Sequence, residues 1–341
     1  MTKIDHYPEA FICPVCRAKV DRMGEGYHCS ACDMIYPVLF GIPDFRIRPD
    51  RYLTLEQERE KAGKLYEFGK TATFSELLDF YYTITDDVPA ELAVRYKAYI
   101  NNAPRLAALT VKDLDLSPDK DVLLDVGCGA GGMLIAATGQ CRAVIGVDIA
   151  LRWLVICKKR LAESGIDAML VCADAEALPF EYGKMTKIVA GDVIEHVYDP
   201  VHLLEVCEQH LMPAGQLWVS ASNRYCLGPN ALTRIWWIGF FPRPMRTRLL
   251  KRLRGVDSLR YINLVSPGYL KQLLGKTGLQ VVRAGPRQVA LVQGCDYPFQ
   301  DRVLIYIYQL ILKSRLLSHA LMWIGPAFEI MTEKPVDRNV P

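Results

Sequence analysis

Five short apolar runs constrain the fold of this 341-residue chain more than any other feature. They cover residues 122–126, 143–148, 168–172, 187–192 and 216–221. Helical patterns lie between them, near 131–139, 151–164 and 200–211. Because buried strands that alternate with crossover helices build a parallel sheet, we expect an α/β fold with a doubly wound, mostly parallel sheet.

The chain is long enough for two domains, or for one large domain with an appendage. Hydrophobic residues make up 51% of it and charged residues 23%, which excludes a disordered or fibrous protein. The aromatic-rich region before the sheet either packs against it or forms a lid over a site. We expect a cysteine-rich module over 1–45, a linker and helical cap over 46–115, the α/β domain over 116–290 with an insertion at 224–262, and an apolar helical extension over 291–341.

Four of the eleven cysteines form two close pairs, Cys13 with Cys16 and Cys29 with Cys32. Two cysteines separated by two residues can form a tight turn in which both sulfur atoms face one ion. Two such turns supply the four sulfur ligands that Zn²⁺ prefers, and a zinc site with four protein ligands is structural rather than catalytic. Redox-active or incidental thiols are the alternative. The other seven cysteines are scattered, and the first ten residues, MTKIDHYPEA, contain no apolar signal region. We therefore expect a reducing, cytoplasmic compartment.

The sequence around these cysteines, FICPVCRAKV and YHCSACDMIYPVLFGIPDF, resembles a family of small zinc ribbons. Members of that family activate methyltransferases or precede them in one chain. The closing YPVLFGIPDF is the most specific part of the resemblance. It implies that residues 1–45 are a zinc ribbon.

A glycine-rich loop with the sequence DVGCG follows the first apolar run, and acidic residues stand at four successive strand ends. Glycines at the loop let a ligand approach the backbone closely. A dinucleotide site is the alternative, because G-x-G-x-x-G is also matched. A carboxylate before the loop does not stabilise a bound pyrophosphate, whereas it does stabilise a bound ammonium group. We therefore expect a nucleoside ligand carrying an amine or sulfonium, met by Asp125, Asp148, Asp174 and Asp192.

The segments DVGCGAGG, GVDIA, ADAEALPF and DVIEHVYDP, followed by LMPAG, resemble class I S-adenosylmethionine-dependent methyltransferases, in particular the quinone-biosynthesis group. The resemblance covers about residues 121–222 and implies a Rossmann-like sheet with S-adenosylmethionine as cofactor. The implied cofactor contacts are Asp125, Gly127, Cys128 and Gly129 for the methionine part, Asp148 and Ile149 for the ribose, Asp174 and Ala175 for the adenine, and Asp192 at the fourth strand end.

The loop Asp192-x-x-Glu195-His196 holds the candidate catalytic residues. It is similar to the E-x-x-E-H loop of quinone O-methyltransferases, which resembles a metal-binding loop, with Asp192 in place of the first glutamate. Methyl transfer mainly requires alignment of the acceptor and exclusion of water. For a hydroxyl acceptor, an imidazole can also serve as general base. The alternative is that His196 only orders the loop.

The insertion after the fifth run combines large rings with arginines, at Trp236, Trp237, Arg243, Arg246 and Arg248. Nine basic residues face one acid between positions 224 and 260, although the whole chain carries a net charge of only +3. We expect these five residues to form a cap on the acceptor side that admits an apolar, anionic acceptor. Such a composition also suits an anionic membrane surface or RNA bases and phosphates.

The stretch 303–330 is too interrupted to span a membrane but suits a membrane-surface helix pair or an acceptor tunnel; helices that cover a sheet edge are the alternative. Together these features predict a zinc-containing methyltransferase, in the cytoplasm or peripheral at the membrane, that O-methylates a hydrophobic, lipid-linked or anionic small molecule. The alternative is an RNA methyltransferase acting on rRNA or tRNA, since rRNA guanine methyltransferases also carry an N-terminal zinc module. A non-enzymatic role is disfavoured by the intact cofactor motifs.

Overall fold

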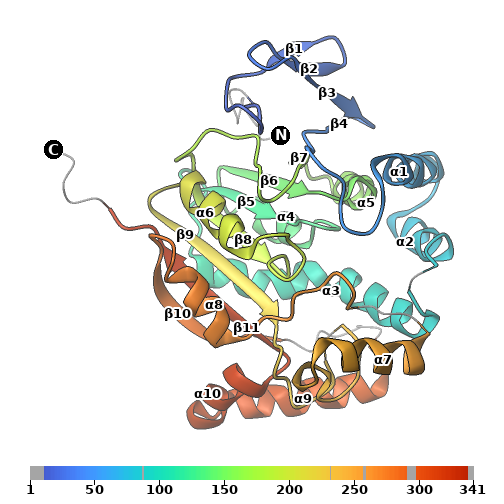
Figure 1. The fold of residues 1–341 in the computed structure, drawn as a ribbon, viewed down its shortest axis with the longest axis vertical. Coiled ribbons are helices and arrows are strands. Elements are labelled where there is room, and N and C mark those ends of the chain that lie inside the picture. The colour runs from blue at the N-terminus through green and yellow to red at the C-terminus, as the bar shows by residue number, and fades with distance from the viewer. Residues whose placement is uncertain (1–10, 87, 231, 256–258, 290–296, 337–341) are drawn as a thin grey trace.

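The computed structural model describes residues 11–86, 88–230, 232–255, 259–289 and 297–336. Its centre is a seven-stranded sheet in the order β10-β11-β9-β8-β5-β6-β7 (Figure 1). The strands β5, β6, β7, β8 and β9 are parallel, and β11 is antiparallel to both of its neighbours. The predicted doubly wound, mostly parallel sheet is therefore confirmed. The strands are β5 (Val122–Val126), β6 (Ala143–Asp148), β7 (Met169–Cys172), β8 (Met185–Gly191), β9 (Leu211–Ser222), β10 (Gln280–Pro286) and β11 (Ala327–Glu333).

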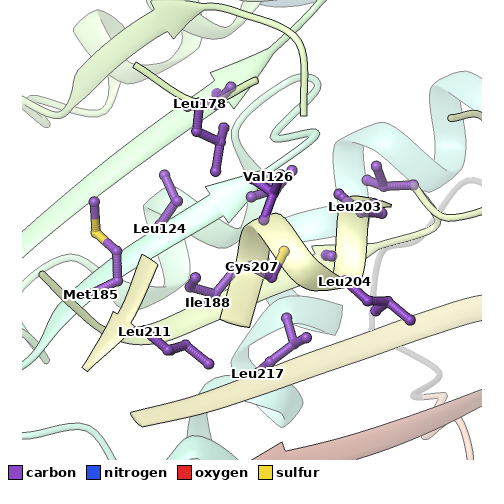
Figure 2. Packing of buried hydrophobic residues seen from close by; sticks show 14 of the residues in the cluster. Leu124, Val126, Leu178, Met185, Ile188, Leu203, Leu204, Cys207, Leu211 and Leu217 are labelled. Carbon is purple, nitrogen blue, oxygen red and sulfur yellow. The ribbon is translucent and has the colours of Figure 1, made fainter. Parts of the chain in front are cut away.

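Helices cover both faces of this sheet. On one face, α6 (Pro200–His210) packs on β9, and α8 (Pro267–Leu274) packs beside α6. Figure 2 shows the apolar side chains of this layer, where Leu203 and Leu204 of α6 lie over Val126 and Leu217 of the strands. On the other face, α4 (Gly132–Ala137) and α5 (Leu151–Glu163) contact β5, β6 and β7. Apolar side chains on both faces of the strands explain the continuous apolar runs in the sequence.

The N-terminal ribbon shares its core with the sheet domain. Its strands are β1 (Asp21–Met23), β2 (Gly26–Cys29), β3 (Met34–Leu39) and β4 (Ile42–Pro43). Phe11 and Phe45 of the ribbon lie in the same buried cluster as Phe180. Arg17 donates hydrogen bonds to the carbonyl oxygens of Leu178 (2.8 Å) and Phe180 (2.5 Å). The ribbon is thus fixed beside the β7 edge of the sheet.

Three helices between the ribbon and the sheet form the predicted cap region: α1 (Leu55–Gly69), α2 (Phe74–Thr83) and α3 (Ala90–Leu114). Capping boxes begin α1 at Thr54 and α2 at Thr73. Helices α1 and α2 pack on α5, and α3 packs on α4. These helices therefore cover the sheet rather than standing apart from it.

The C-terminal part differs from the sequence-based expectation. Helices η1 (Ile238–Phe240), α7 (Arg243–Arg254), α9 (Phe299–Leu312) and α10 (Arg315–Ile324) gather at the end of the molecule opposite the ribbon (Figure 1). Residues 327–333 then return as β11 between β9 and β10. The prediction of an all-helical extension over 291–341 is therefore wrong for this segment, in which residues 328–332 are buried. Within the described ranges, every helix is too short or too polar to serve as a transmembrane span.

Candidate functional site

A cavity of about 880 Å³ lies at the carboxyl ends of β5, β6, β7 and β8. This is where parallel sheets of this kind bind their ligands. Residues 50–53, which precede α1, form part of its wall together with residues of α1 and α2. The site residues predicted from sequence that line it are Gly127, Gly129, Asp148, Ile149, Asp174, Ala175, Asp192 and His196.

The glycine loop brings the backbone close to this cavity. Gly127 has a φ of +74°, and a Cβ there would lie 2.2 Å from a methyl carbon of Val193. Asp148 is the last residue of β6, and its carboxylate accepts hydrogen bonds from the backbone N–H groups of Gly129 (2.9 Å) and Ala150 (2.8 Å). Burial raises the pKa of Asp148, while these two N–H groups oppose the rise. The loop and the acid thus hold each other in place.

A second cavity of about 340 Å³ adjoins the first, because Gly127, Gly129 and Asp192 line both. Asp125 and Cys128, also predicted from sequence, line this one. Burial, together with the charge of Asp148, raises the pKa of Asp125 well above its ordinary value. Since a buried carboxylate is costly without a cation, this position suits an ammonium group.

The acid after β7 has a partner that sequence reasoning missed. Arg48, in the segment between ribbon and cap, forms ion pairs with Asp174 and Glu176. Its guanidinium also lies over the ring of Tyr198, 4.4 Å from the centroid. The Asp174 carboxylate accepts the N–H of Glu176 as well, at 2.9 Å. Asp174 therefore lines the cavity as a carboxylate whose orientation is already fixed.

We call residues 44–53 the strap, because they lead from the ribbon across the loops of the sheet. Arg46 binds Asp44 in a buried ion pair and donates to the carbonyl oxygen of Ile149 at 3.3 Å. Asp50 pairs with Arg152 at 2.9 Å. The strap thus contacts the loops after β6, β7 and β8.

Asp192 lies where the two cavities meet, in a left-handed backbone conformation with a φ of +56°. Its carboxylate pairs with Arg287 at 2.5 Å. The Tyr308 hydroxyl donates to the carbonyl oxygen of Arg287 at 2.9 Å, and Arg287 itself donates to the Tyr99 hydroxyl at 3.4 Å. A cation therefore accompanies Asp192 at the junction of the two cavities.

His196 lines the larger cavity, and its Nδ1 lies 3.1 Å from the hydroxyl oxygen of Tyr52 in the strap. Burial lowers the pKa of His196; Asp192 opposes this shift and Arg51 adds to it. A histidine in this state is neutral at neutral pH and can accept a proton.

Glu195 is placed differently from the expectation that it contributes to catalysis. Its side chain lines neither cavity, and its carboxylate accepts the backbone N–H of Ser222 at 3.2 Å. Its other oxygen, Oε2, has no hydrogen-bond partner among the described residues. Burial raises the pKa of Glu195 to about 8, and the charge of Asp192 adds to the shift. Of Glu195 and His196, only His196 lines the cavity, because the Glu195 side chain turns inward under the end of β9.

The ribbon brings together the four predicted zinc ligands. The sulfur atoms of Cys13, Cys16, Cys29 and Cys32 all lie within 4.8 Å of one another, which fits a tetrahedral ion. His28 instead contacts Asp33 at 2.9 Å. Among the described residues, the four cysteines are the only group of three or more potential metal ligands that lie close together. The side chains of Asp192, Glu195 and His196 do not form a second such group.

The residues predicted on the acceptor side lie outside both cavities. The described residues that line the two cavities do not include Trp236, Trp237, Arg243, Arg246 or Arg248. Trp236 and Trp237 are 52% and 55% exposed. The expected cap over the crevice is therefore wrong in position: α1, α2 and α3 cover the cavities, and the insertion packs beyond β9.

Residues that sequence reasoning missed come from distant parts of the chain. Arg48 and Tyr52 precede the sheet by some seventy residues, and Arg287 follows the insertion. One indication of such residues was present in the sequence, the high aromatic content of the cap region. Three tyrosines of that region, Tyr82, Tyr96 and Tyr99, line the second cavity.

Residues 124–219 match the family model described as a methyltransferase domain. The ubiquinone biosynthesis O-methyltransferase of Pseudomonas entomophila is 36% identical over 104 residues, which cover 30% of this chain and 44% of that protein. The same enzyme of Salmonella paratyphi A is 31% identical over 124 residues, which cover 36% of this chain and 50% of that protein. The chain thus spans half or less of the length of these relatives.

Among solved structures, a phosphoethanolamine N-methyltransferase of Haemonchus contortus has a TM-score of 0.46 and 16% identity, and the match covers 78% of this chain and 61% of that one. A complex of the Haloferax volcanii Trm112 methyltransferase activator with a methyltransferase also has a TM-score of 0.46, at 15% identity, covering 71% of this chain and 94% of that one.

Proposed function

This chain carries a class I methyltransferase domain that includes residues 124–219, and we propose that it transfers a methyl group from S-adenosylmethionine to a hydroxyl of a hydrophobic small molecule. The observation that carries the proposal is the cavity of about 880 Å³ that Asp148, Asp174 and His196 line together. It combines cofactor acids with a candidate base in one space.

The residues around this cavity fit S-adenosylmethionine in charge and shape. A buried Asp125 suits the ammonium of the methionine part, and Gly127 lets the loop turn at the cavity wall with a φ of +74°, which residues with a Cβ rarely adopt. Asp148 is proposed to accept the ribose hydroxyls, and Asp174 with Ala175 to meet the adenine. S-adenosylmethionine supplies a methyl group on a positively charged sulfur, which is already a good leaving group.

His196 is the proposed general base. Its Nε2 would take the proton of the acceptor hydroxyl while the oxygen bonds to the methyl carbon; the carbon–sulfur bond breaks with its electron pair on sulfur, leaving S-adenosylhomocysteine. The lowered pKa of His196 keeps the imidazole able to accept this proton. Tyr52, 3.1 Å from Nδ1, is proposed to hold the ring in this orientation as a positioning residue.

The second cavity would hold the methionine part of the cofactor beside Asp125. The rest of this cavity, which meets the larger cavity of His196 at Asp192, is the proposed acceptor space. Its rings supply apolar surface, and Arg287 supplies a cation for an anionic group. The curated relatives named for ubiquinone biosynthesis support a hydrophobic acceptor that is O-methylated. The rings that line this cavity are Tyr82, Tyr96, Tyr99, Trp153 and Trp218.

The proposal is tested by incubating the full chain and methyl-labelled S-adenosylmethionine with two fractions, a total lipid extract and total RNA. We expect label in the lipid extract. His196→Gln should lower its rate of incorporation by about 10²–10⁴-fold, and Tyr52→Phe by about fivefold, with cofactor affinity unchanged by calorimetry. His202→Gln, at an exposed position of α6, is the matched control.

Label in RNA instead of lipid would contradict the proposed acceptor and establish the RNA methyltransferase alternative. Full activity of His196→Gln would remove this histidine from the chemistry.

A further inference from the structure

Helices α9 and α10 present exposed apolar side chains to solvent. On α9 these recur at intervals of three and four residues, so they share one face of the helix. Phe299 is 78% exposed and Leu316, at the start of α10, is 81% exposed. Soluble monomers rarely expose large contiguous apolar patches, and such patches mark interaction sites. The exposed residues are Phe299, Val303, Tyr306, Ile307 and Leu310 on α9, with Leu316, Leu317, Trp323 and Ile324 on α10.

The opposite side of α9 is anchored, which fixes the direction of the apolar face. Asp301 is buried and forms ion pairs with Arg95 of α3 and Arg234 of the insertion. Two turns beyond Asp301 on α9, Tyr308 is buried and its hydroxyl donates to the carbonyl oxygen of Arg287. The inward side of α9 thus supports a residue of the second cavity while the outward side stays apolar.

Helix α10 is attached to the segment that follows β9. The side chain of Asn223 donates to the carbonyl oxygen of Trp323 at 2.8 Å, and the backbone N–H of Leu227 donates to that of Ile324 at 3.0 Å. In Figure 1, α7, α9 and α10 lie together at the end of the molecule opposite the ribbon. The insertion and the two helices therefore belong to one end of the molecule.

The exposed charges of the insertion, α9 and α10 are positive, although Glu91 of α3, which is 81% exposed, pairs with Arg254 of α7 at 3.2 Å. Residues 299–324 contain one acid, Asp301, which is buried and paired. Residues 232–254 contain none. The insertion adds exposed rings at Trp236, Trp237 and Phe240. The exposed cations are Arg243, Arg248, Lys251 and Arg252 on α7, and Arg302, Lys313 and Arg315 on or beside α9 and α10.

We propose that these exposed residues of η1, α7, α9 and α10, together with Trp236 and Trp237, form a docking face for an anionic lipid bilayer. Aliphatic side chains gain free energy in the acyl region, rings suit the headgroup level, and the cations meet anionic headgroups. Nucleic-acid bases would stack on rings but gain nothing from Leu316 or Ile307. Two copies of this face would bring like charges together. The anionic bilayer therefore matches both the apolar surface and the charge.

This face deepens the proposed function, since it would bring the second cavity to a membrane that contains hydrophobic acceptors; the docking itself does not depend on catalysis. It is tested by co-sedimentation of the full chain with vesicles of phosphatidylcholine alone and vesicles that also contain phosphatidylglycerol. We expect stronger binding to the anionic vesicles, weakened by salt.

Phe299→Glu and Leu316→Glu should each weaken vesicle binding on the order of tenfold, because a charge replaces a side chain that enters the bilayer. Ile35→Glu is the matched control, since Ile35 is 65% exposed on the ribbon, at the other end of the molecule. Arg248→Glu with Lys251→Glu should remove the preference for anionic vesicles. Calorimetry with S-adenosylmethionine confirms that each variant keeps a folded cofactor site.

Failure of the unaltered protein to bind either vesicle would overturn the proposal, as would an equal loss of binding in Ile35→Glu. Sedimentation that reveals a dimer abolished by Leu316→Glu would assign the face to a second copy instead. Weakened RNA binding in that variant would assign the face to nucleic acid. Vesicle binding without any labelled lipid product would keep this inference and contradict the proposed function.

Discussion

The cofactor side and the acceptor side of this molecule are built in different ways. On the cofactor side, each functional residue stands within a few positions of a strand end, as Asp125, Asp148 and Asp174 do. On the acceptor side, Tyr99, Asp192 and Arg287 meet from segments almost two hundred residues apart. The first arrangement is written locally in the sequence, whereas the second exists only after the sheet has formed.

The strap belongs to neither side alone. It begins at the cysteine-rich ribbon, pairs with the acid after β7 through Arg48, and ends near His196 through Tyr52. A change in the ribbon therefore reaches both the proposed adenine contact and the proposed base. Three measurements can break or sharpen the contrast between local and assembled sites.

The largest effect is expected from Cys13→Ser with Cys16→Ser. Zinc binding stabilises small ribbons by about 10 kcal/mol or more, so the ribbon should lose its metal and unfold while the sheet stays folded. Metal analysis should give about one zinc in the unaltered protein and none in the variant, and limited proteolysis should cleave only before the cap. Because the strap loses its anchor, cofactor affinity should fall as well.

Cys226→Ser, a buried cysteine of the acceptor side, is the control and should retain the zinc. Freshly purified protein without zinc would contradict the structural role of the four cysteines. Unchanged cofactor affinity in the double variant would show that the strap does not depend on the ribbon.

A smaller effect is expected from Asp148→Ala. The variant loses the proposed acceptor of two ribose hydrogen bonds and should bind S-adenosylmethionine more weakly by about 2–4 kcal/mol. Titration calorimetry measures this change, with Asp167→Ala as an exposed control on the loop before β7. Affinity equal to that of the unaltered protein would refute the role given to Asp148 at the end of β6.

The sheet and the cofactor loops were predictable from sequence because their determinants are short-range. An apolar run of five residues indicates a buried strand, and an acid directly after it lies at the binding edge. The four cysteines are likewise close in sequence, and their sulfur atoms converge in the fold.

The remaining features could not be predicted because they depend on how distant segments pack. Residues 327–333 look like the end of an apolar tail, yet they form a strand between β9 and β10. Trp236 and Trp237 were expected over the crevice, but packing of α9 on the insertion through Asp301 directs them elsewhere. Arg48 and Tyr52 carry no motif, so only the path of the strap reveals their partners.

The smallest effect is expected at Glu195, which is buried and adjoins His196 in the sequence but lines neither cavity. Its carboxylate accepts the N–H of Ser222, and its carbonyl oxygen accepts that of Asn263 at 2.8 Å. Burial raises its pKa from 4.5 to about 8 in the folded protein. The folded state therefore keeps a proton that the unfolded chain releases above about pH 4.5, so this stabilisation is complete at lower pH and is lost as the pH rises to about 8.

Glu195→Gln cannot ionise and should escape this loss. Between pH 5 and pH 8 the unaltered protein should lose free energy of unfolding that the variant keeps. The difference in free energy of unfolding, variant minus unaltered protein, should therefore increase by roughly 1–3 kcal/mol over this range. Urea unfolding at both pH values measures the difference, and Glu56→Gln, at an exposed position of α1, should show none. A variant that follows the pH dependence of the unaltered protein would contradict the buried, protonated state. If the rate of methyl transfer by Glu195→Gln fell as far as that of His196→Gln, Glu195 would take part in catalysis. A residue next to the strand end would then act on the acceptor side.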